Sequence, residues 1–257
     1  MAPLAAMLLW AAGSPAAAQT VNATFLSASP ASSTVIRTIM TGPGAPQTGS
    51  TQSVERFEMQ YNSGTIANTF VGSGVPGRFY AFCIEPRQTI SANVAVSYNY
   101  VTLDQGTTNI GGMGATKAGM IEELFGRWAP QMDANMTTLQ AGALQVAIWE
   151  IVRELPGNAL DVFTGNIFFA TPESAAGTIA LAQTYVQSLT GVGPRAIGLY
   201  GLNNGTMGDP STTAGSQDLL VQSRPSSVPE PGSMGLVAAG IAVLGVVRRR
   251  RRGPAVD

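Results

Sequence analysis

The chain has 257 residues, of which 45% are hydrophobic and only 11% charged, and its formal net charge is -1. It contains no histidine, which excludes Ser-His-Asp and Cys-His catalysis and removes the commonest metal ligand. Its one cysteine cannot form an internal disulfide or a thiolate metal site. With a single lysine, Lys117, the chain is also poorly suited to bind nucleic acid. We therefore expect no metal, no cofactor and no nucleic-acid partner. The low charge indicates an exported, strand-rich protein.

The first predicted element is an export signal. An apolar run at 4–12 is followed by Ala16-Ala17-Ala18, a small-residue cleavage site before Gln19. We assign residues 1–18 to a secretory signal peptide, whose apolar run is too short to span a bilayer. No Lys or Arg precedes that run, a departure from the usual pattern that leaves the true start codon open. A buried N-terminal helix is the alternative.

Residues 19–224 form the predicted exported domain, which begins with strands and then changes to a helical period. Helices are expected at 116–128, from Thr137 or Thr138 to 155, and at 172–189, with Thr116 and Thr171 as N-caps of the first and third. The predicted strands are 21–25, 34–40, 55–61, 69–71, 78–84, 94–103, 166–169, 197–200 and 218–222. This order predicts an α+β fold, a β-sandwich or barrel with an inserted helical subdomain.

Residues 225–257 contain three elements of a sorting tail. Val228-Pro229-Glu230-Pro231 precedes an uncharged segment, 232–247, predicted as a short transmembrane helix. Five arginines follow, and positive charge at this end is expected to stay in the cytoplasm: Arg248, Arg249, Arg250, Arg251 and Arg252. The tail resembles the PEP-CTERM sorting signal of Gram-negative bacteria. That resemblance implies an inner-membrane intermediate, cleavage by an exosortase near Pro-Glu-Pro, and delivery to the cell surface or extracellular matrix.

Two residues of the exported domain carry candidate chemistry. Cys83 ends an aromatic strand, in the run Phe82-Cys83-Ile84-Glu85, and an unpaired cysteine is unusual in an exported protein. Gln145 lies within the second predicted helix, in the run 144–149. Taken singly, each is more simply read as a core residue: a small buried hydrophobe and a satisfied core amide.

Together the two runs resemble the paired motifs of bacterial thioester domains, over roughly residues 69–222. The resemblance implies an internal thioester between Cys83 and Gln145, and an adhesin that binds covalently to an amine or hydroxyl on a surface protein or polysaccharide. Each molecule would react once, so the protein would not be an enzyme. The fold would have to hold sulfur and carbon at near-attack distance and exclude water, with Tyr80, Phe82 and Trp149 as candidate shielding rings.

Two other functions stay open on the sequence. The protein could be a non-covalent structural or carbohydrate-binding matrix module, with Cys83 buried in the core. It could instead be a hydrolase with paired carboxylates drawn from Glu122, Glu123, Glu150 and Glu154. Such acidic runs are usually solvated helix faces, so a hydrolase is the least favoured reading.

Overall fold

The computed structural model describes residues 19–31, 34–40, 49–86, 88–107, 113–132, 135–170, 175–204 and 216–224. The chain divides after Arg224 into two units, and all described residues belong to the first. The predicted signal peptide (1–18) and transmembrane segment (232–247) lie outside the described residues. Within the described part, no helix is both long and apolar enough to cross a bilayer.

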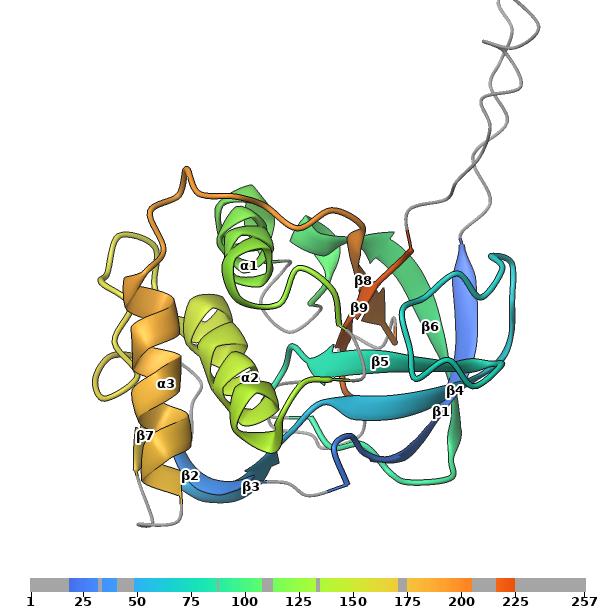
Figure 1. Cartoon of the computed structure of the whole chain (residues 1–257), viewed down its shortest axis with the longest axis horizontal. Helices are drawn as coiled ribbons and strands as arrows, with labels where there is room; N and C mark the ends of the chain where they lie inside the picture. The colour runs from blue at the N-terminus through green and yellow to red at the C-terminus, as the bar shows by residue number, and fades with distance from the viewer. Residues whose placement is uncertain are drawn as a thin grey trace, which may run out of the picture. The chain divides into compact units, whose positions relative to one another are not determined.

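Six antiparallel strands form a closed barrel, in which neighbours along the ring are hydrogen-bonded. The barrel brings together strands that are distant in sequence: the strand nearest the C-terminus lies between β5 and β8 (Figure 1). In ring order the strands are β1 (Thr20–Ala28), β4 (Phe57–Gly64), β5 (Arg78–Cys83), β9 (Leu219–Gln222), β8 (Leu199–Asn203) and β6 (Ala95–Thr102).

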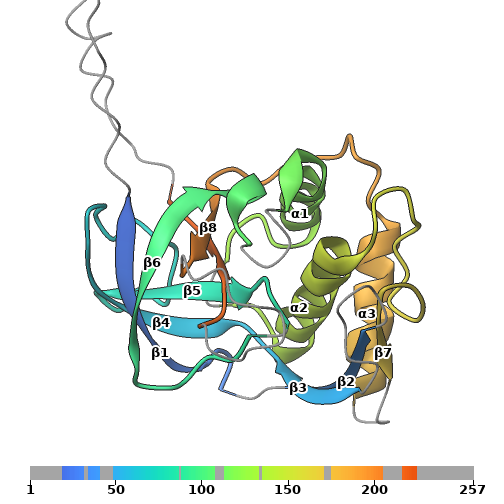
Figure 2. The same cartoon turned by 180° about the vertical axis from the view of Figure 1, so that it is seen from behind.

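A second, three-stranded sheet lies beside the helices rather than in the barrel (Figure 2). Its order is β3 (Ser50–Val54), β2 (Thr34–Met40) and β7 (Ile167–Ala170). Within the described residues, the helical elements are a short 3-10 helix, η1 (Leu103–Gln105), and three α-helices, α1 (Gly114–Trp128), α2 (Thr138–Arg153) and α3 (Ala176–Gln187).

Helix α2 is the centre of the helical layer and lies between α1 and α3 (Figure 1). Its N-cap is Thr137, one of the two predicted start residues, and Thr137 and Gln140 exchange hydrogen bonds in a capping box. Residues 141–152 are all buried, so the helix is covered on every side. A Cβ at Gly142 would lie 2.9 Å from the Thr178 side chain, so this glycine lets α3 pack closely.

The structure corrects the sequence analysis at several elements. Of the two predicted architectures, a sandwich or a barrel, the structure shows a closed barrel, and it contains one strand, β3, that was not predicted. The predicted strand 69–71 contributes only an isolated bridge at Phe70. Helix α1 starts two residues early, with Met113 rather than Thr116 at its N-cap. Helix α3 starts at Ala176, and Thr171 lies outside the described residues.

Candidate functional site

Cys83 is the last residue of β5, where one edge of the strand loses its partner. On one side, β9 continues to pair, and Ile84 N–H donates to Asp218 C=O at 2.9 Å. On the other side, pairing with β4 ends at Ala81 opposite Phe57. Because backbone groups alternate direction along an antiparallel strand, the N–H and C=O of Cys83 face this open edge.

The Gln145 carboxamide fills the open edge from α2. Cys83 N–H donates to Gln145 Oε1 at 2.9 Å, and Gln145 Nε2 donates to Cys83 C=O at 2.6 Å. The side chain therefore pairs with Cys83 as a neighbouring strand would. Both residues are 1% exposed, so the pair is shielded from water. The structure thus brings together two predicted site residues that are 62 positions apart.

The Cys83 thiol is held in its protonated form. Its Sγ donates to the backbone carbonyl of Glu85 at 3.2 Å. Burial raises the pKa of Cys83 well above its ordinary value, the Trp149 indole lowers it by less, and the negative charges of Glu85 and Asp218 raise it further. The contact with the Trp149 N–H falls outside the geometry of a full hydrogen bond.

Several buried polar groups surround the thiol that the sequence analysis did not single out. The Glu85 carboxylate forms a buried ion pair with Arg153 at 3.6 Å. Burial, followed by the charges of Asp218 and Cys83, raises the pKa of Tyr98. The motif around Cys83 could have indicated Glu85, which follows by two residues, whereas Asp218 and Arg153 are brought near it only by the fold.

Arg78 and Arg87 are the two arginines closest to Cys83 in the sequence. Arg78 forms an ion pair with Glu58 at 3.1 Å, and Arg87 lies outside the described residues. The structure instead places Arg153 against Glu85, two residues from Cys83, and its guanidinium pairs with the Glu85 carboxylate.

The three aromatic side chains predicted to shield the site are all buried. Trp149 lies beside the sulfur, since its indole affects the thiol pKa directly. Phe82 packs edge-on against Phe125 of α1, with ring centroids 5.7 Å apart. The Tyr80 ring is covered by the Arg56 guanidinium, 3.6 Å from its centroid.

The predicted carboxylates each have a structural contact. Glu122 forms an ion pair with Arg195 at 3.3 Å. Burial raises the pKa of Glu150 to about 8, although a hydrogen bond from Asp161 N–H opposes this shift. The Glu150 carboxylate is fully buried, so no substrate can reach it in this structure. Glu154 accepts hydrogen bonds from the loop that follows α2.

Glu123 is a buried anchor for the loop after α3. Burial opposes its charge, but hydrogen bonds from Thr190, Arg127 and Gly191 together lower the pKa of Glu123 to about 2. This carboxylate therefore stays ionised and fixes the 190–191 backbone to α1.

No group of three or more acidic or cysteine side chains in the described residues is placed to hold a metal ion. The sorting residues, Val228 to Pro231 and Arg248 to Arg252, lie outside the described part of the chain.

Comparison with known proteins identifies the tail. Residues 227–252 match the family model described as the PEP-CTERM protein-sorting motif. The chain is therefore an exported protein that passes through a membrane-anchored intermediate and is sorted to the cell surface, with exosortase as the partner that recognises its tail. No curated protein and no solved structure matches the chain.

Proposed function

We propose that residues 19–224 form a surface adhesin that captures a partner covalently through a Cys83–Gln145 thioester. The observation that carries this proposal is the two-point pairing of the Gln145 carboxamide with the Cys83 peptide group in a site closed to water. The partner would supply an amine or a hydroxyl, from a surface protein or a polysaccharide.

The pairing favours attack on the amide carbon. The Cys83 N–H points at Gln145 Oε1, where negative charge develops when sulfur adds to the carbonyl. A fixed donor of this kind typically contributes about 10²–10³ in rate. Holding the two residues together adds the advantage of an intramolecular reaction.

The first step forms an S–C and an N–H bond and breaks the C–N and S–H bonds. Cys83 Sγ bonds to the Gln145 carbonyl carbon, the carbon–nitrogen bond breaks, and the thiol proton leaves with the amide nitrogen as ammonia. No oxidant or reductant is needed. The thiolate is the attacking form of cysteine, so the raised pKa of Cys83 opposes this step, and the proton that sulfur gives up is the one the amide nitrogen takes as it leaves.

The second step transfers the acyl group to the partner. An amine nitrogen or hydroxyl oxygen attacks the same carbon, the carbon–sulfur bond breaks, and the partner's proton passes to sulfur. The partner is then held by an amide or ester bond, and the thiol is free. Each molecule reacts once, so there is no catalytic turnover.

Intact mass of the full chain, purified from an exporting host, tests the proposal. The wild type should be lighter by one ammonia than its processed sequence requires, and Cys83→Ala and Gln145→Ala should show no deficit. Methylamine should add one methylamine to the wild type and release one titratable thiol. Gln140→Glu, an exposed change on the same helix, should keep the deficit. A wild type of full mass with a free thiol would refute the proposal.

A non-covalent matrix module is the second candidate, and one observation favours it. The hydrogen bonds of the pair already account for both residues: Gln145 completes the open edge of β5, and the thiol donates to Glu85. On this reading Cys83→Ser and Gln145→Ala would alter stability without removing any covalent product. The same mass measurement separates the two candidates.

A further inference from the structure

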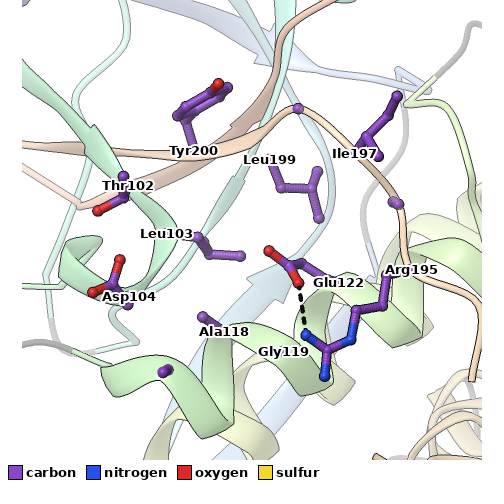
Figure 3. Close-up of a pocket in the computed structure, with 13 residues that line it drawn as sticks. Thr102, Leu103, Asp104, Ala118, Gly119, Glu122, Arg195, Ile197, Leu199 and Tyr200 are labelled. Carbon is purple, nitrogen blue, oxygen red and sulfur yellow. Dashed lines mark hydrogen bonds and ion pairs between the residues drawn. The ribbon is translucent and has the colours of Figure 1, made fainter. Parts of the chain in front are cut away.

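A cavity of about 640 Å³ lies between η1, the first half of α1 and the chain that enters β8 (Figure 3). Its volume falls within the roughly 300–1,000 Å³ typical of small-molecule sites. None of the residues that line it belongs to the Cys83–Gln145 pair.

Small residues on α1 leave room for this cavity, and residues 195–198 form one side of it. A Cβ at Gly119 would lie 3.1 Å from the Arg195 guanidinium, so the glycine lets this arginine lie across the helix. Ala196 N–H donates to the Glu122 carbonyl at 2.8 Å, which fixes the wall to α1. Gly198 then turns the chain into β8 with a φ of 75°, a conformation that favours glycine. The cavity is thus built by the backbone of the fold.

The floor of the cavity is apolar. Leu103, Ala118 and Leu199 form it, and each is buried. Beside this floor, Figure 3 shows the paired side chains of Glu122 and Arg195, with Asp104 across from them, whereas the Tyr200 ring points away from Leu199. Apolar surface with a few convergent polar groups is the usual character of a ligand site.

The rim offers both hydrogen-bond donors and acceptors. Asp104 and Glu122 present carboxylate oxygens that accept, and Arg195 presents N–H groups that donate. A ligand whose only polar group is a cationic nitrogen would donate to the two carboxylates but would be repelled by the positive charge of Arg195. A ligand rich in hydroxyls would use the whole rim.

The charges of the rim disfavour an anion. Glu122 and Arg195 form an ion pair at 3.3 Å and so compensate each other. Asp104 has no ion pair with another described residue, which leaves one negative charge at the rim. A phosphate or a uronate would be repelled, whereas a neutral polyol would not.

We propose that this cavity binds a neutral sugar ring of a polysaccharide. A sugar ring has an apolar C–H face, which matches the floor, and an edge of hydroxyls that each donate and accept, which matches the rim. The inference does not depend on the thioester.

Equilibrium binding of the full chain to immobilised polysaccharides tests this site. The probes are the neutral polymers glucan, galactan and mannan, with alginate, a polyuronate, as the anionic comparison. We expect retention on at least one neutral polymer, little change between low and high salt, and no retention on alginate. Cys83→Ala should bind as well as the wild type, which separates this result from any failure of the thioester.

Asp104→Ala should weaken retention at least tenfold. Glu58→Ala removes the same charge outside the cavity and should leave retention unchanged. The proposal is overturned if no neutral polymer is retained, if alginate is retained equally, or if the two variants behave alike.

Discussion

The pairing of Gln145 with the Cys83 peptide group makes a quantitative prediction about stability. In a Cys83→Ala background, where no thioester can form, Gln145→Leu keeps side-chain bulk but removes both hydrogen bonds. The N–H and C=O of residue 83 then lose their partners in a site that is about 1% exposed. An orphaned buried polar group costs about 1–3 kcal/mol, so the loss should be roughly 2–6 kcal/mol.

Urea unfolding of the full chain, followed by circular dichroism, measures this loss as a lower transition midpoint. Gln187→Leu in the same background is the control, since Gln187 is exposed on α3 and its replacement should change stability by less than about 0.5 kcal/mol. A loss for Gln145→Leu that is no larger than the control's would refute the reasoning, because the two backbone groups would then have other partners.

Three further predictions concern groups away from the thiol. Burial raises the pKa of Glu150 from 4.5 to about 8, so the contribution of its protonated form to stability is full below pH 4.5 and is lost as the pH rises through 8. In urea titrations at pH 9, Glu150→Gln should therefore be more stable than the wild type by a few kcal/mol. The same change of unfolding free energy with pH in both proteins would contradict this. For Glu123 the sign is opposite, because burial is outweighed by hydrogen bonds to the carboxylate and the pKa falls to about 2. Glu123→Gln should therefore lower the free energy of unfolding by roughly 3 kcal/mol at pH 7 but by little at pH 2. Thermal melts at both pH values would show this difference. Gly126→Ala should destabilise by more than 1 kcal/mol, because its Cβ would collide with the Pro194 carbonyl; a variant that melts with the wild type would show that the 191–198 segment yields easily.

The strands and helices that the sequence predicted correctly are those with strong local signals. β2 is a run rich in β-branched residues, and Thr137 is an N-cap residue for α2, so both can be predicted from neighbouring residues. β3 was missed because Ser50, Thr51, Gln52 and Ser53 have weak strand signals, and its ladder depends on pairing with β2. Leu155, predicted as the last residue of this helix, is 51% exposed because the helix ends at Arg153.

The sequence by itself determined where the protein goes, because a sorting tail is a linear signal read from order and spacing alone. It also singled out Cys83 and Gln145 as the residues whose chemistry needs explanation. Only the tertiary structure decided that β5 loses its partner at Cys83 and that Gln145 fills the gap, since both depend on where β4 ends. It alone also joined Asp104, Glu122 and Arg195 around one cavity. Contacts between residues tens of positions apart arise from chain closure and packing, which no local pattern encodes.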